Sequence, residues 1–167
     1  MDGKAILWAP WRMQYVTGAK PTGCFLCEKH QDSNDAENYV VSRGVRCYGI
    51  LNIFPYNPGH VMIVPYEHLP SVGDLDEETL AEMMILVSRC VKLLQKTMSP
   101  SGFNVGMNIG RVAGAGVAEH VHAHVVPRWE GDANFMPVVG STKVLPEELR
   151  STYKRLREAW SSLEGIR

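Results

Sequence analysis

The segment His120-Val121-His122-Ala123-His124 places three histidines at alternate positions, and no other feature constrains the fold as strongly. Alternate side chains share one face of a strand, with Cα atoms about 6.6–7 Å apart. The apolar neighbours predict a buried strand from Val117 to Val126, ended by Pro127. Three imidazoles on one face of such a strand indicate a polar site; a solvated histidine-rich strand or a metal clip is the alternative.

Runs rich in valine, tyrosine and isoleucine predict the remaining strands. They lie at residues 39–42, 45–54, 61–64 and 103–109. Gly44 joins the first two runs as a hairpin, and a tight turn between Pro55 and Gly59 leads to the third. We therefore expect a mainly antiparallel sheet.

Apolar residues at helical spacing predict one long helix that crosses this sheet and ends near Met98. Asp74, with Glu77 three residues later, is expected to cap its start. Pro146 is expected to open a C-terminal helix within residues 144–167, because proline is tolerated in a first helical turn. Helices and antiparallel strands together define an α+β fold.

A chain of 167 residues suits one domain, which we expect to span residues 1–167, with an aromatic N-terminal arm at residues 1–20. The net charge of −1 gives no electrostatic case for binding nucleic acid or an acidic membrane surface. No apolar run approaches the roughly 18 residues that a membrane span needs. Residues 1–10 lack the order of a signal peptide, so we expect a cytoplasmic protein.

A glycine-rich loop, Gly110 to Gly116, comes directly before the histidines. Small residues let backbone N–H groups approach a ligand closely, and successive N–H groups in a turn can bind a phosphate. Neutral imidazole is a good nucleophile toward phosphorus when one ring nitrogen is free and the other is hydrogen-bonded. The loop and the histidines together predict chemistry at a phosphate group with a histidine nucleophile.

Cys24 and Cys27 form a Cys-x-x-Cys pair that can present two thiolates to one tetrahedral zinc ion. His68, which follows the strand at 61–64, and His120 supply the two further ligands. A pair of core cysteines is the alternative, and a redox role is a lesser one. Two other cysteines lie in apolar stretches and are expected to be core residues, namely Cys47 and Cys90.

The motif at residues 120–126 resembles that of the histidine triad (HIT) superfamily, in which histidines and apolar residues alternate. The segment from Asn57 to Pro65 resembles the one that this family carries before its long helix. Two further segments, Trp129 to Pro137 and Trp8 to Arg12, resemble a bacterial and archaeal branch that includes dinucleoside tetraphosphate (Ap4A) phosphorylases and hydrolases. The resemblance covers nearly the whole chain and implies a HIT-like fold.

The resemblance implies that His122 is the nucleophile and forms a nucleotidyl-histidine with the α-phosphorus of the substrate. It implies that His124 contacts the phosphate and assists the leaving group, and that His60 supports the triad from the neighbouring strand. The residues it implies in nucleotide binding are Asn52 at the ribose, Asn108 at the phosphate, Gly114, Gly116 and Trp129. In many relatives a polar side chain reaches the phosphate where this chain has Gly116 and Val117.

The related galactose-1-phosphate uridylyltransferases bind zinc through a Cys-x-x-Cys pair and two histidines. Their pattern corresponds to Cys24, Cys27, His68 and His120, and it implies a structural zinc ion. Members of the family are usually homodimers, so the resemblance also implies a homodimer.

The sequence therefore predicts an enzyme that cleaves dinucleoside polyphosphates at the α-phosphorus, with phosphate or water as acceptor. A nucleoside phosphoramidase or general nucleotide hydrolase of the same family is the first alternative. A zinc-stabilised nucleotide-binding module without catalysis is an alternative of another class.

Overall fold

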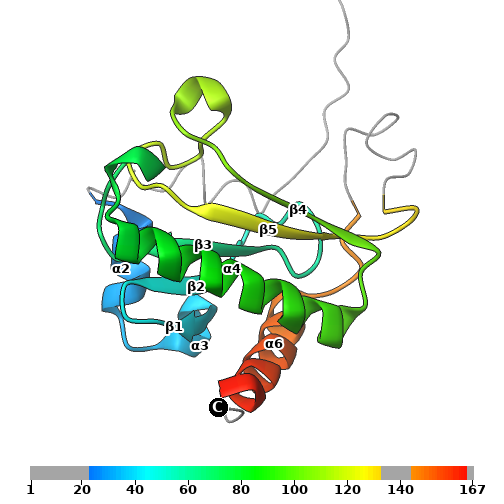
Figure 1. The fold of residues 1–167 in the computed structure, drawn as a ribbon. Helices are drawn as coiled ribbons and strands as arrows, with labels where there is room; N and C mark the ends of the chain where they lie inside the picture. Colours follow the sequence, from blue (N-terminus) through cyan, green and yellow to red (C-terminus); the bar gives the residue numbers. More distant parts are fainter. Residues whose placement is uncertain (1–22, 133–143, 165–167) are drawn as a thin grey trace, which may run out of the picture.

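The computed structural model describes residues 23–132 and 144–164, in which five strands form one sheet with the order β1-β2-β3-β5-β4 (Figure 1). The strands are β1 (Val40–Arg43), β2 (Cys47–Leu51), β3 (Val61–Pro65), β4 (Gly102–Met107) and β5 (Ala123–Arg128). Each neighbouring pair in the sheet is antiparallel. The predicted aromatic arm at residues 1–20 lies outside the described residues.

Two helices, α4 (Glu77–Met98) and α6 (Leu149–Glu164), pack against one face of the sheet, as Figure 1 shows for α4. Two short helices, α2 (Phe25–Gln31) and α3 (Asp35–Asn38), precede β1. Two 3₁₀ turns complete the described elements, η2 (Val72–Asp74) before α4 and η3 (Arg111–Ala113) between β4 and β5. None of the described helices has the length and apolarity that crossing a membrane requires.

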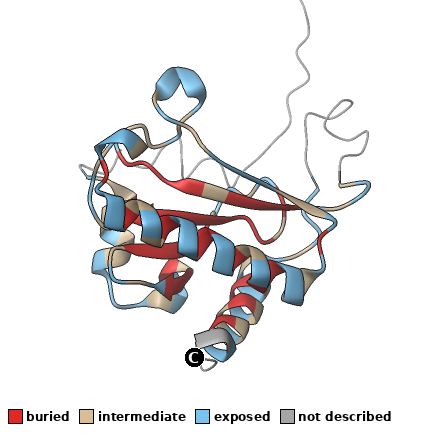
Figure 2. Ribbon diagram, viewed as in Figure 1, coloured by how far each residue is buried: buried red, intermediate tan, exposed pale blue. Residues whose placement is uncertain are grey.

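The alternation of side chains along the segment that leads into β5 separates the core from the opposite face. Val121, Ala123 and Val125 belong to the main hydrophobic core with the buried side chains of α4 and α6, so the helices are buried on one side and exposed on the other (Figure 2). Because neighbours in an extended chain point to opposite sides, His122 and His124 project away from the helices.

Among the described residues, the opposite face of the sheet has a smaller core, at the end formed by β1, β2 and β3. Leu26 of α2 packs there with Tyr48 and Met62, and the Tyr48 hydroxyl donates to the Leu26 carbonyl oxygen at 2.6 Å. This contact fixes α2 against the sheet, and the end near β5 and β4 remains for the histidines.

The α+β fold, the antiparallel sheet and the long helix ending at Met98 are confirmed. The predicted strand from Val117 to Val126 is wrong in its bounds, because β5 begins at Ala123 and continues through Pro127 to Arg128. The Val121 N–H donates to the Leu69 carbonyl at 2.7 Å instead of to a neighbouring strand, so the chain before β5 lies outside the ladder.

The predicted starts of both long helices are also corrected. Asp76, rather than Asp74, caps α4, because its Oδ1 accepts a hydrogen bond from the Thr79 N–H at 2.6 Å. Asp74 lies in η2. The C-terminal helix begins at Leu149, three residues after Pro146.

We expect Leu93→Ala to lower the free energy of unfolding by about 2–5 kcal/mol, because Leu93 is fully buried between α4 and the sheet and its truncation leaves a cavity. Met84→Ala on the same helix is the control, since 54% of that residue is exposed, and it should change the value by less than about 1 kcal/mol. Urea denaturation measures both. Equal losses would contradict the assignment of the core face.

Candidate active site

Three histidines, His60, His122 and His124, meet on the face of the sheet opposite α4 and α6, which we call the open face. His124 lies on β5 opposite Met62 of β3, and His60 comes just before β3. The turn before β3 places His60, because its N–H donates to the Asn57 carbonyl at 3.1 Å. Gly59 in this turn has a φ of +78°, and a Cβ there would lie 2.7 Å from the Met98 sulfur, so the turn requires glycine.

Hydrogen bonds from the backbone fix which nitrogen of His60 carries the proton. The Tyr56 N–H donates to His60 Nδ1 at 3.1 Å, so that nitrogen is an acceptor. A neutral ring then has its proton on Nε2, which donates to His124 Nδ1 at 3.0 Å. His124 in turn has its proton on Nε2, which can donate to a ligand on the open face.

The tautomer of His122 is fixed in the same way. Its Nδ1–H donates to the His120 carbonyl oxygen at 2.9 Å, which leaves the Nε2 lone pair free. The rings of His122 and His124 meet edge to face with centroids 4.8 Å apart. The site therefore presents one nucleophilic nitrogen beside one N–H donor, which is the pairing that nucleotidyl transfer through histidine requires.

Burial keeps these rings neutral. Burial, together with the nearby His124 and His122, lowers the pKa of His60 to about 3. Burial also lowers the pKa of His124 to about 4. The pKa of His122 is lowered by burial, while its hydrogen bond to the His120 carbonyl acts in the opposite direction. A neutral imidazole is the nucleophilic form, so the environment favours reactivity near neutral pH.

Of the two predicted nucleotide-binding asparagines, Asn52 lies next to the His60 ring and Asn108 directly follows β4. The Asn52 Nδ2 lies 3.4 Å from His60 Nδ1, and its Oδ1 accepts from the Phe54 N–H at 2.9 Å. Asn108 directly follows β4, whose last residue, Met107, pairs with Ala123. By alternation, the Asn108 side chain belongs to the face that carries His122.

The hydrogen bonds of the glycine-rich loop and of Trp129 are made away from the histidine rings. The loop projects from the sheet around η3 (Figure 1), and the Gly114 N–H donates to the Arg111 carbonyl at 3.0 Å. In this conformation that N–H is used within the loop, whereas Gly116 is exposed and has no such bond among the described residues. The Trp129 indole N–H donates to the Met98 carbonyl at 3.3 Å, at the C-terminal end of α4.

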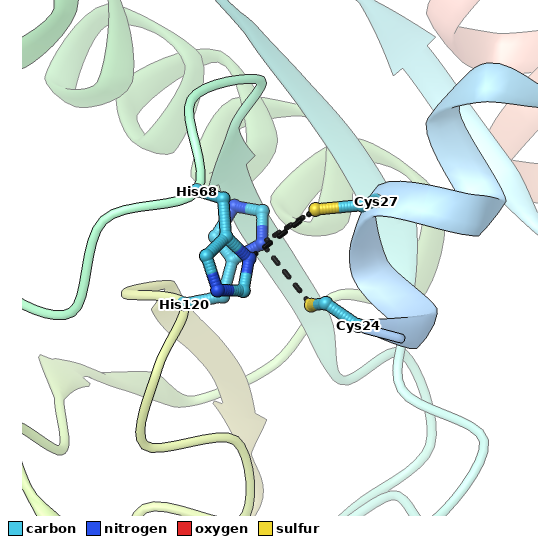
Figure 3. A group of neighbouring side chains, drawn as sticks. All are labelled: Cys24, Cys27, His68 and His120. Atoms are coloured by element: carbon cyan, nitrogen blue, oxygen red, sulfur yellow. Dashed lines mark hydrogen bonds between the residues drawn. The ribbon is translucent and has the colours of Figure 1, made fainter. Parts of the chain in front are cut away.

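The predicted metal ligands come together from three separate parts of the chain, as Figure 3 shows. The Cys24 sulfur lies 3.3 Å from His120 Nδ1, and the Cys27 sulfur lies 3.3 Å from His68 Nδ1. All four ligand atoms lie within 4.8 Å of one another. Sulfur and nitrogen ligands of one tetrahedral zinc ion lie roughly 3.6 Å apart, so the spacing fits such an ion.

His120 is oriented toward the cysteines by its other ring nitrogen. Its Nε2–H donates to the Pro65 carbonyl at 2.9 Å, which leaves the Nδ1 lone pair directed at the two sulfurs. A carbonyl that orients the far nitrogen in this way is typical of metal-binding histidines. The same residue gives its own carbonyl to His122, so the two clusters share it.

Two residues of the site were not predicted from the sequence. Tyr56 places its ring 4.6 Å from the His60 ring and 5.8 Å from the His124 ring, in addition to its backbone hydrogen bond. Asp132 Oδ2 accepts from Asn57 Nδ2 at 2.7 Å and so holds the turn that positions His60. Tyr56 lies just outside the segment from Asn57 to Pro65, and a tyrosine in a turn a few residues before a histidine was the available signal for it. Asp132 lies within the segment from Trp129 to Pro137, so the resemblance of that segment was the available signal for it.

Comparisons with known proteins match residues 33–131 to the HIT domain model. An AP-4-A phosphorylase of Mycobacterium tuberculosis is 41% identical over 165 residues, which cover 93% of this chain and 84% of that protein. A zinc-bound histidine triad family protein of Mycobacterium smegmatis has a similar structure, with a TM-score of 0.69 and 27% identity over 87% of this chain and 98% of that one. A hypothetical histidine triad nucleotide-binding protein of Sulfolobus tokodaii gives a TM-score of 0.67 and 30% identity, covering 84% and 94%.

The lowered histidine pKa values predict how stability depends on pH. Unfolded histidines bind protons near pH 6.5, whereas folded His60 and His124 resist protonation down to about 3 and about 4. Below about pH 6.5 the unfolded state therefore binds more protons than the folded state. The contribution of these two histidines to the free energy of unfolding is constant above about pH 6.5 and falls as the pH decreases below it.

We expect His60→Gln to reduce this fall, because it removes the more strongly shifted group while leaving the Cys–His cluster intact. Urea denaturation of both proteins at several pH values between about 7.5 and 4.5 measures the two slopes. The same slope in the variant as in the wild type would contradict the lowered pKa of His60.

Proposed function

Because the chain belongs to the HIT domain family, we propose that it is an enzyme that transfers a nucleotidyl group from a dinucleoside polyphosphate such as Ap4A. The transfer proceeds through His122 to inorganic phosphate, with water as the alternative acceptor. The observation that carries the proposal is the free Nε2 of His122, fixed by the hydrogen bond from its Nδ1 to the His120 carbonyl. The name of the Mycobacterium tuberculosis relative supports phosphate as the acceptor.

In the first step the lone pair of His122 Nε2 attacks the α-phosphorus of the substrate. A P–N bond forms, the P–O bond to the second nucleotide breaks, and the leaving oxygen takes the electron pair. His124 Nε2–H donates a hydrogen bond to this oxygen, and the His120 carbonyl stabilises the positive charge that develops on the His122 ring.

In the second step an oxygen of inorganic phosphate attacks the same phosphorus, and the proton of that phosphate is lost to solvent. The P–N bond breaks and its electron pair returns to His122 Nε2, so the free enzyme is restored. With Ap4A the products are ATP from the first step and ADP from the second; water as acceptor would give AMP instead of ADP.

The remaining predicted site residues are proposed to hold the first nucleotide. Asn52 suits the ribose hydroxyls because its amide lies beside His60 on the open face. Asn108 and the Gly116 N–H suit the phosphates as hydrogen-bond donors. Gly114 has no side chain, so it lets the phosphates approach the loop closely. Trp129 is proposed to form a wall of the site, anchored at the end of α4.

We propose that the Cys–His cluster holds a structural zinc ion. Cys24, Cys27, His68 and His120 offer two thiolates and two imidazoles at a spacing that fits tetrahedral zinc. The ion would join α2 to the segment that carries His122, and it would fix the carbonyl that selects the His122 tautomer.

The protein is further proposed to be a cytoplasmic homodimer. β4 is an edge strand of the sheet, and Val105 in it is 47% exposed, which is an apolar surface that a second copy could cover.

We expect His122→Ala to reduce Ap4A turnover at least about a thousandfold, because the variant lacks the nitrogen that forms the covalent intermediate. His30→Gln is the control, since this histidine packs between Tyr48 and Tyr66 and should retain turnover. Chromatography of the products with and without phosphate tests the acceptor. ADP and ATP formed only with phosphate support phosphorolysis, AMP and ATP without phosphate support hydrolysis, and wild-type turnover by His122→Ala excludes this nucleophile.

We expect the purified protein to contain zinc in about a one-to-one ratio and Cys27→Ser to lose most of it. Thermal unfolding should shift to lower temperature in the variant, and in the wild type after treatment with a chelator. Cys90→Ala, a core cysteine on α4, is the control and should keep its zinc. Zinc content that is equal in Cys27→Ser and in the wild type would contradict the site.

A further inference from the structure

Beyond His124 the open face continues into a hollow of about 170 Å³. Its lining residues are Tyr56, Asn57, Asn104, Val126 and Arg128. Val126 and Arg128 follow His122 and His124 at alternate positions, so they share their face, and Asn104 pairs with Val126 from β4. The hollow is therefore adjacent to the catalytic histidines and on the side toward β4.

The Arg128 guanidinium in this hollow has its charge compensated. Its Nε and Nη2 donate to the Asp132 carboxylate at 2.6 and 2.8 Å, and its Nη1 donates to Asn104 Oδ1 at 2.7 Å. These bonds occupy the edge of the guanidinium and hold its plane in place, but they leave its flat face for stacking. A guanidinium in this state suits a planar aromatic ligand better than a phosphate.

The other side chains offer contacts that suit a nucleobase. The Tyr56 residue is 51% exposed although its ring lies against His60 and His124, so it offers an aromatic surface. Bases stack on such rings regardless of their identity. Asn104 uses its oxygen for Arg128, and within the described part of the chain its amide hydrogens have no acceptor, so they can donate to a base nitrogen.

On this face of β4, Asn104 lies between two glycines, and Gly106 is the one on the side toward the histidines. Gly106 pairs with His124 and Gly102 pairs with Arg128. A Cβ at either glycine would meet no atom within 4 Å. His124 and Arg128 lie four residues apart in a strand, about 13 Å between Cα atoms. Because Gly106 has no side chain, there is room beside His124 for a chain of phosphates that leads to the hollow.

We propose that this hollow binds the base of the second nucleotide, the one that leaves when His122 is nucleotidylated. This inference rests on the proposed function, because it assigns a subsite to the same substrate. The occupant is one purine ring system, since the hollow is smaller than the roughly 300–1,000 Å³ of pockets for larger ligands. The polyphosphate lies over Gly106, and the base stacks between Tyr56 and Arg128.

The test compares two substrates that share the first nucleotide. Ap4A has a second base, whereas adenosine 5′-(4-nitrophenyl phosphate) has a simple aryl leaving group. We expect Asn104→Ala and Gly102→Val to lower the ratio of kcat/KM for Ap4A to that for the aryl ester by about tenfold or more. The first variant removes the amide, and the second adds a side chain opposite Arg128, where a Cβ meets no protein atom within 4 Å.

Met84→Ala is the control, because Met84 is 54% exposed on α4, on the other face of the sheet, and the ratio should not change. If both substrates lose activity in proportion in the two test variants, the second base does not bind in the hollow and the inference is wrong. If the wild type cleaves neither substrate, the proposed function fails by itself. In that case equilibrium binding of Ap4A tests whether the second base binds in the hollow. Equal Kd values for Asn104→Ala and the wild type would overturn the inference.

Discussion

The hydrogen bond from His122 Nδ1 to the His120 carbonyl is the interaction on which the chemistry of this protein depends. It is made two residues away along the chain, at 2.9 Å, and it leaves Nε2 as the free nitrogen. A second series of bonds, from the Tyr56 N–H through His60 to His124, places a proton on the neighbouring ring. Nucleophile and donor are thus set by the backbone before any substrate binds, which is the preorganisation that electrostatic catalysis needs.

The fold positions that backbone through residues 120–125, which have apolar side chains on the side toward the helices and histidines on the other side. Val121, Ala123 and Val125 are buried against the helices, and this burial fixes the position of the intervening histidines. His120 links the catalytic and the cysteine–histidine clusters, because its ring faces Cys24 and Cys27 while its carbonyl holds the nucleophile. Any movement of that cluster would therefore be transmitted to the reacting nitrogen.

The histidine spacing alone predicted which side chains share a face, although the strand there begins only at Ala123. The rings of His122 and His124 lie next to each other, as alternation along an extended backbone requires, whereas His120 lies at a bend and its ring faces the two cysteines. The short helices α2 and α3 were not predicted, since seven and four residues are too few to show a helical period. Nor could the sequence predict the roles of the Pro65 and His120 carbonyls, because every residue has a carbonyl and only the fold selects one.

The most direct measurement is to trap the covalent intermediate and locate it. The protein is mixed with Ap4A in the absence of phosphate and quenched in alkali, where a phosphorus–nitrogen bond survives, and its peptides are then analysed by mass spectrometry. The account predicts an adenylyl group on His122 of the wild type and none on that peptide in His122→Ala. An adduct on another residue, or turnover of Ap4A by a wild type that never carries the group, would contradict it.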